Sequence, residues 1–257
     1  MATLSIIIPH YRTEQYIKLC LRSLRKYSKS NLEVIVVDNG SDDGSIDYLN
    51  TVSWINLVVN PTRSLGSRAH AEGLDLGVKR ATGEWLCFFH SDTIVLKPGW
   101  DDYLIQKMRT SQAMGLSTLE RDLNIFEPYS EKCKRRLKEL RKSITSWFFK
   151  GKGNQKIMSF CFFIRRDIFL NTGFSFSISN ADVVSDLYRD KIKGKYPFLL
   201  LHRKELEPLL WHTSNVTSIL TGQIKDEMLV DKFNKKKALI MEREEILRIL
   251  NDNSLDH

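Results

Sequence analysis

Cysteine is scarce in this chain, and its arrangement excludes two classes of small protein. The four cysteines are far apart in the sequence and form no Cys-x-x-Cys pair: Cys20, Cys87, Cys133 and Cys161. A zinc site or a disulfide framework would need closely spaced or paired cysteines. Cys87 and Cys161 lie in apolar runs, where a thiol behaves as a small core side chain. The pattern favours a reducing compartment.

Long apolar segments are also missing. No stretch approaches the roughly 18 apolar residues that a membrane-spanning helix needs. Met1-Ala2-Thr3-Leu4 runs directly into a β-branched segment, which leaves no room for a signal peptide. We therefore expect a cytoplasmic protein, with peripheral attachment to the inner face of a membrane as a further option.

Low-complexity and collagen-like composition is absent as well. The 257 residues include 13 Gly and 6 Pro, and 42% are hydrophobic, which predicts a globular chain with a packed core. The net charge of +8 favours an anionic partner, such as a nucleotide, a diphosphate or a phospholipid surface. Only the net charge would support nucleic-acid binding, since the sequence has no recognition motif and no base-stacking pattern. We therefore do not expect a nucleic-acid partner.

The first hundred residues alternate between two hydrophobic periods. Uninterrupted apolar strands are separated by segments with helical spacing, which predicts a mainly parallel sheet covered by helices on both faces. The expected strands are 5–9, 33–38, 55–59 and 85–89, and the expected helices are 14–27, 42–49 and 66–81.

The pattern changes after Pro98. We expect helices at 100–109 and 180–191, a buried strand at 158–164 and a short strand at 198–201. From about residue 218 the chain is charged and helical, with Leu239, Ile246 and Leu250 along one side. That side could pack against a second subunit, so a homodimer is one option.

Polar clusters follow the predicted strands of the first half, at 9–11, 38–45, 66–68 and 90–92. Because the carboxyl ends of parallel strands share one edge of a sheet, these clusters can converge on a ligand. Asp38 could accept hydrogen bonds from a base or ribose, Tyr11 could pack against a base, and Arg68 could pair with a phosphate. Asp92 could hold a divalent cation that bridges a diphosphate.

Each of these residues also has an ordinary structural interpretation. Asn39-Gly40 and Asp43-Gly44 are common turn sequences. Asp42 or Ser45 could only cap a helix, and Tyr11 could be a core aromatic. The shared position of the clusters on one edge favours function for the set.

Four segments together resemble family 2 glycosyltransferases of the GT-A fold, including bacterial rhamnosyl- and hexosyl-transferases. They are Ser5-Ile6-Ile7-Ile8-Pro9-x-Tyr11, Val36-Val37-Asp38-Asn39-Gly40-Ser41-x-Asp43-Gly44-Ser45, Asn60 to Gly66, and Phe89-x-Ser91-Asp92-Thr93. The resemblance is dense over about 4–100 and weaker to about 215. It implies an α/β fold with a donor-binding half at 1–100, an acceptor-binding half of the same domain at 101–217, and a helical extension at 218–257.

The resemblance also assigns site residues. Pro9, Tyr11 and Asp38 would line the nucleoside pocket, Arg68 would lie near the donor, and Asp92 would match the metal-binding last aspartate of an Asp-x-Asp motif. His212, in Trp211-His212-Thr213-Ser214-Asn215, would complete the metal shell of Mn²⁺ or Mg²⁺. A satisfied core histidine is the alternative for His212.

Two positions depart from the family pattern. His90 stands where the first acidic residue of the motif is usual; with Ser91 it could contact the donor, orient Asp92, or only fill space. In the acceptor block, Ala181-Asp182 replaces the familiar Glu-Asp pair. Asp182 is the candidate catalytic base, with Asp186 on the same helix face to support it. Alternatively, both are exposed acids near a helix start.

The resemblance implies an inverting hexosyl- or deoxyhexosyl-transferase that uses a nucleoside-diphosphate sugar, with UDP or dTDP favoured and GDP possible. The acceptor would be a saccharide or a lipid-linked saccharide in polysaccharide or glycolipid assembly. The basic and aromatic segment 132–150 could touch a membrane, or be a solvated loop over the acceptor.

Two rival functions stay open from the sequence. A decayed, non-catalytic transferase domain could bind an anionic membrane or a nucleotide. A sugar-nucleotide pyrophosphorylase would need a glycine-rich basic loop after the first strand, and Pro9-His10-Tyr11-Arg12-Thr13 is not such a loop.

Overall fold

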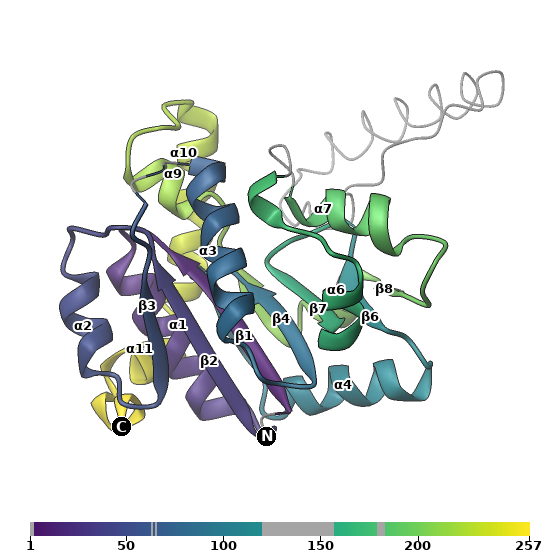
Figure 1. Ribbon diagram of the computed structural model, residues 1–257. Helices are drawn as coiled ribbons and strands as arrows, with labels where there is room; N and C mark the ends of the chain where they lie inside the picture. The colour runs from purple at the N-terminus through teal and green to yellow at the C-terminus, as the bar shows by residue number, and fades with distance from the viewer. Residues whose placement is uncertain (1–2, 63, 65, 120–156, 179–182) are drawn as a thin grey trace, which may run out of the picture.

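The computed structural model describes residues 3–62, 64, 66–119, 157–178 and 183–257 (Figure 1). Its central element is a seven-stranded sheet with the strand order β3-β2-β1-β4-β7-β6-β8. These strands are β1 (Leu4–His10), β2 (Leu32–Asp38), β3 (Ile55–Val59), β4 (Trp85–Phe89), β6 (Gly115–Thr118), β7 (Cys161–Arg165) and β8 (Leu199–Leu201). A separate two-stranded sheet pairs β5 (Thr93–Val95) with β9 (Leu210–His212).

The sheet is mainly parallel, as predicted. β3, β2, β1 and β4 pair in parallel, and β6 pairs in parallel with β8. β7 is antiparallel to both of its neighbours and joins the two parallel groups. The carboxyl ends of β1, β2 and β4 therefore lie at one edge, where the polar clusters of the first half follow them.

Alternate residues of the central strands enter two separate cores, as the period of two in a strand requires. On one face, Ile6, Val36 and Phe89 pack with α1 (Glu14–Tyr27), α4 (Trp100–Thr110) and α11 (Glu244–Asn251). On the other face, Ile7 and Phe88 pack with α3 (Gly66–Arg80) and with the segment that contains α6 (Arg166–Asn171), η2 (Phe176–Ile178) and α7 (Val183–Leu187). Figure 1 shows α3 in front of β1 and α1 behind the sheet.

Several predicted boundaries shift by a few residues. The helix expected at 42–49 is α2 (Ser45–Thr51), because Gly44 adopts a left-handed φ of 85° and the Asp43 carboxylate accepts a hydrogen bond from the Ser45 N–H. The strand expected at 158–164 is β7, which begins at Cys161. The helix expected at 180–191 is described from Val183, and it continues beyond α7 as a π-helical turn over Tyr188–Ile192.

The C-terminal segment folds back onto the first helix of the same chain. It contains α8 (Arg203–Leu206), α9 (Val216–Leu220), α10 (Glu227–Met241), α11 and the 3-10 turn η4 (Asn253–Asp256). Of the residues expected along one side of this segment, Ile246 is buried in the core of the same chain, whereas Leu239 is 45% exposed and the adjacent Ile240 is buried. The Arg22 guanidinium on α1 forms a buried ion pair with Asp256, with Nε 2.9 Å from Oδ1.

Two predictions based on composition concern the core and the membrane. Cys20, Cys87 and Cys161 are buried free thiols, while Cys133 lies outside the described residues. Among the helices in the described ranges, none combines the length and the apolar character needed to cross a membrane.

Candidate functional site

The small β5–β9 sheet brings together two parts of the chain that carry polar side chains. Thr93 pairs with His212 in an antiparallel register, and the Thr213 N–H donates to the Asp92 carbonyl at 3.2 Å. This pairing holds His212 beside the loop that follows β4. His90 and His212 are therefore in contact although 122 residues separate them in the sequence.

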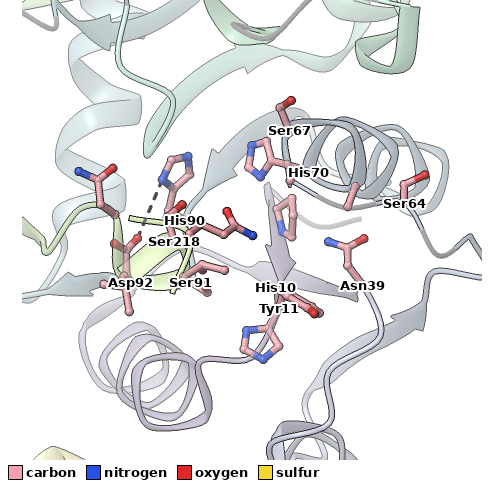
Figure 2. Close-up of a pocket in the computed structure, with 17 residues that line it drawn as sticks. His10, Tyr11, Asn39, Ser64, Ser67, His70, His90, Ser91, Asp92 and Ser218 are labelled. Atoms are coloured by element: carbon pink, nitrogen blue, oxygen red, sulfur yellow. Dashed lines mark ion pairs between the residues drawn. The ribbon is translucent and has the colours of Figure 1, made fainter. Parts of the chain in front are cut away.

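His90, Asp92 and His212 form a compact cluster. His212 Nε2 lies 3.2 Å from Asp92 Oδ1 and 3.3 Å from His90 Nδ1. His90 Nδ1 lies 3.9 Å from Asp92 Oδ1, the pair marked in Figure 2. One ligand atom from each residue lies within 4.8 Å of the other two. The predicted pair of Asp92 and His212 is thus joined by a third donor, His90.

The outer ring nitrogens of both histidines meet serine hydroxyls. Ser159 Oγ lies 2.9 Å from His90 Nε2, and Ser214 Oγ lies 3.2 Å from His212 Nδ1. The His212 ring also stacks on Phe160, with centroids 4.5 Å apart and an interplanar angle of 8°. Both rings are therefore fixed in orientation, with their remaining nitrogens turned toward Asp92.

The surroundings of the cluster shift the pKa values of His90 and Asp92 so that one side chain is neutral and the other is charged. The pKa of His90 is lowered to about 3, mainly by burial and also by the neighbouring His212 and His70, while Asp92 opposes the shift. Burial alone would raise the pKa of Asp92, but the adjacent His212 and His90 hold it at about 2. At neutral pH, His90 is therefore a neutral imidazole beside an ionised carboxylate.

This donor set fits a divalent transition metal. Neutral imidazole nitrogens and a carboxylate oxygen suit Mn²⁺, Co²⁺ and Zn²⁺. Serine contacts at the outer nitrogens are the kind of support that ligating histidines usually have. The residues present thus fit the metal role that the sequence predicted for Asp92 and His212.

A cavity of about 350 Å³ opens beside the cluster (Figure 2). His90 and Asp92 lie at one end of it and Asn39 and Ser64 at the other. Its lining comes from the ends of β1, β2 and β4, the start of α3 and the α9 region: Pro9, His10, Tyr11, Asn39, Ser64, Gly66, Ser67, Ala69, His70, His90, Ser91, Asp92, Asn215, Val216, Thr217, Ser218 and Gln223.

The structure brings together most of the predicted site residues. Pro9, Tyr11, His90, Ser91 and Asp92 line the cavity, and His212 reaches Asp92 from β9. All except His212 come from the clusters that were predicted to share one edge of the sheet, and His212 was predicted from the family resemblance.

Asp38 and Arg68 lie elsewhere among the described residues. The buried Asp38 carboxylate accepts hydrogen bonds from the Gly40 N–H at 2.9 Å and the Ser41 hydroxyl at 2.6 Å. The side chain next to it, Asn39, lines the cavity instead. Arg68 is exposed on α3 and pairs with Glu72, with Nε 3.1 Å from Oε1. Their contact with a donor stays a prediction.

The candidate base Asp182 lies outside the described residues. Asp186, its predicted supporting residue, is on α7 and forms an ion pair with Arg189 at 2.8 Å. The catalytic assignment of Asp182 therefore stays a prediction.

Some lining and supporting residues were not predicted. His70 lies in the first turns of α3, two residues beyond the 66–68 cluster, and its closeness to that cluster was a usable signal. Ser159 belongs to the strand expected at 158–164 and Ser214 to the block that contains His212, but neither pattern indicated a contact with a histidine ring.

Comparison with known proteins gives a consistent result. Residues 5–173 match the family model described as Glycosyl transferase family 2. The chain is 27% identical over 110 residues to the glycosyltransferase GlyG of Streptococcus pneumoniae, across 43% of this chain and 36% of that protein. It spans 30% to 38% of the length of three curated relatives that it matches.

Two solved structures are similar in fold. Staphylococcus aureus TarS 1–349 superposes with a TM-score of 0.59 and 17% identity, over 92% of this chain and 72% of that one. The mannosyltransferase PcManGT from Pyrobaculum calidifontis, solved with GDP-Man and Mn²⁺, gives a TM-score of 0.56 and 16% identity, over 79% and 55%. These likenesses confirm the predicted GT-A-type fold.

Proposed function

Because the chain belongs to glycosyl transferase family 2, we propose that it transfers a hexose or deoxyhexose from a nucleoside-diphosphate sugar to an acceptor hydroxyl with inversion. One observation carries the proposal: the cavity at the carboxyl ends of β1, β2 and β4 ends at the His90–Asp92–His212 cluster. A ligand with an aromatic base at one end and a diphosphate at the other matches that arrangement.

The nucleoside would occupy the end of the cavity formed by Tyr11 and Asn39. Asn39 is held in place because its Oδ1 accepts a hydrogen bond from Asn60 Nδ2 at 2.8 Å. Its amide N–H groups are the donors available to a carbonyl of a base. TarS has been solved with UDP and PcManGT with GDP-Man. We favour UDP or dTDP for this chain, with GDP as the alternative.

The diphosphate would lie toward Asp92 and His212. A bound Mn²⁺ or Mg²⁺ would supply positive charge to the departing nucleoside diphosphate. The protein would present the Asp92 carboxylate in its ionised form and both imidazole rings in a fixed orientation. The serine contacts and the stacking on Phe160 fix the orientation of the rings.

Asp182 would act as the base in a single displacement. Its carboxylate takes the proton from the acceptor hydroxyl, and the hydroxyl oxygen forms a bond to the anomeric carbon. The bond from that carbon to the diphosphate oxygen breaks, and the nucleoside diphosphate leaves with the electron pair. General base catalysis of this kind contributes about 10²- to 10⁴-fold in rate.

The acceptor would be a saccharide or a lipid-linked saccharide, with segment 132–150 touching the membrane from the cytoplasmic side. That segment lies outside the described residues. A homodimer through the C-terminal helices is supported by Met228 and Leu239 on α10, which are 70% and 45% exposed.

The test of the function is Asp182→Asn, with donor binding and transfer measured separately. Donor binding is followed as a Mn²⁺-dependent thermal shift by UDP, dTDP and GDP, and transfer as release of nucleoside diphosphate. We expect a shift for one base, and a loss of transfer of at least about 100-fold in the variant with its donor affinity kept.

Asp231→Asn on the exposed face of α10 is the matched control and should leave both readings unchanged. Near-normal transfer by Asp182→Asn would rule out that base. The absence of any shift with all three nucleotides would argue against the donor class itself.

A further inference from the structure

We infer that His90 is a third metal ligand, so that two imidazoles and one carboxylate select Mn²⁺, Co²⁺ or Zn²⁺ over Mg²⁺. The inference deepens the proposed function and rests on metal-assisted transfer at the same site. An Asp-x-Asp motif offers only oxygen atoms to its metal. The replacement of its first acid by His90 changes the donor chemistry of the site.

The spacing of the donor atoms supports a shared ion. Ligands about 2.1 Å from one metal lie roughly 3.0 to 3.4 Å apart when the angle between them is between right-angled and tetrahedral. His212 Nε2 is 3.2 Å from Asp92 Oδ1 and 3.3 Å from His90 Nδ1. The third separation, 3.9 Å between His90 Nδ1 and Asp92 Oδ1, corresponds to a wider angle at the metal.

The outer nitrogen of His90 has the contact that a ligating histidine requires. Ser159 Oγ lies 2.9 Å from His90 Nε2. When Nε2 carries the proton and donates it to Ser159, the lone pair of Nδ1 is free and points into the cluster. Ser214 has the same relation to His212, at 3.2 Å from Nδ1. The same support at both histidines indicates one role for both.

The alternative role for His90 is contact with the donor sugar or ribose. The cluster geometry disfavours it, because Nε2 contacts Ser159 Oγ and Nδ1 faces the other two candidate ligand atoms, His212 Nε2 at 3.3 Å and Asp92 Oδ1 at 3.9 Å. His90 lines the cavity, and His70 packs against it with ring centroids 5.4 Å apart.

Ligand chemistry then sets the metal preference. Mg²⁺ prefers carboxylate, carbonyl and water oxygens, while imidazole suits the later first-row metals. With two nitrogen donors out of three, we expect Mg²⁺ to bind weakly, and affinity to rise from Mn²⁺ to Co²⁺.

The experiment titrates metal-free full-length protein with MgCl₂, MnCl₂, CoCl₂ and ZnCl₂, without any sugar nucleotide. Affinity is read by calorimetry, and the ligand set by the visible absorption of bound Co²⁺. We expect Co²⁺ to bind at least about 10-fold more tightly than Mg²⁺. His90→Asn should lower Co²⁺ affinity by at least about 10-fold and alter its spectrum, with little change for Mg²⁺.

Two further variants sharpen the result. Ser159→Ala keeps all three ligands but removes the support of His90, and it should lower Co²⁺ affinity by about 10-fold. His257→Asn removes an exposed histidine and should change nothing. Circular dichroism of each variant shows whether it is folded, and His90→Gln replaces His90→Asn if the latter does not fold.

Unchanged Co²⁺ affinity and spectrum in a folded His90 variant would overturn the inference, as would equal affinity for Mg²⁺ and Co²⁺. Both results are independent of nucleotide binding and transfer. A protein that shows either one, but still shifts with a nucleoside diphosphate and transfers sugar, would refute the ligand role of His90 and leave the proposed function intact.

Discussion

His10 is a buried histidine without a role in the metal cluster. It is the last residue of β1 and only 1% exposed, and burial lowers its pKa from 6.5 to about 4, although Asp38 and Asp43 oppose the shift. Nδ1 lies 3.3 Å from Thr13 Oγ1, and Nε2 has no partner among the described residues. The folded protein therefore holds this imidazole neutral over a range in which the unfolded chain protonates it.

The first prediction concerns acid stability. Between pH 6.5 and 4 the unfolded chain binds a proton at residue 10 that the folded protein does not, so the stability of the fold falls as the pH falls. His10→Asn removes this dependence, and we expect it to reduce the loss of stability between pH 7 and pH 5 by about 2 kcal/mol. Urea unfolding of both proteins at the two pH values measures this.

The exposed His257 provides the comparison, since His257→Asn should leave the pH dependence of unfolding as it is. If His10→Asn loses as much stability on acidification as the parent, His10 is not the group responsible.

At the scale of elements, the contact between α3 and β1 depends on a glycine. A Cβ added at Gly77 would lie 2.3 Å from Ile7 Cγ2, so the helix backbone rests directly on the strand. The same helix carries Ser67, Ala69 and His70 into the cavity. Gly77 thus allows α3, which contributes to the cavity wall, to pack closely on β1.

The second prediction is that Gly77→Ala destabilises the protein by about 1 to 3 kcal/mol, because overpacking outweighs the helix propensity gained. Chemical denaturation measures the change. In an Ile7→Ala background the same substitution should cost less, since the clashing methyl group is gone. An equal cost in both backgrounds would place the strain elsewhere.

At the scale of the whole molecule, a buried ion pair holds the C-terminal segment against α1. The side chains of Arg22 and Asp256 are 3% and 8% exposed. Tyr48 on α2 adds a hydrogen bond from its hydroxyl to Asp256 Oδ1 at 2.9 Å. One carboxylate thus joins three elements that are far apart in the sequence.

The third prediction is that Asp256→Ala lowers the free energy of unfolding by about 3 to 5 kcal/mol, because Arg22 is left buried without its partner. Asp231→Ala breaks an exposed pair with Lys235 and should cost less than about 1 kcal/mol. Thermal and urea unfolding of both variants tests the contrast, and similar losses for the two would contradict it.

The sequence predicted the sheet well and the site in part, for identifiable reasons. The strands around β1 are apolar on both faces, so their pattern was unambiguous. The start of α2 was missed because Gly44 delays it. Leu239 is exposed while the adjacent Ile240 is buried, and helical spacing alone does not show which of two neighbouring apolar residues faces the core. The link between Asp92 and His212 depended on family resemblance, since a contact across so long a separation leaves no local pattern.

The β5–β9 pairing determines when the His90–Asp92–His212 cluster can form during folding. A fragment of residues 1–100 would contain His90 and Asp92 but not His212, so the three-donor cluster exists only after the second half has returned to the first. A cation bound by the three residues would link two parts of the chain that are distant in the sequence. A higher free concentration of the cation would then raise the melting temperature by mass action, and metal uptake during refolding would report the pairing of β5 with β9.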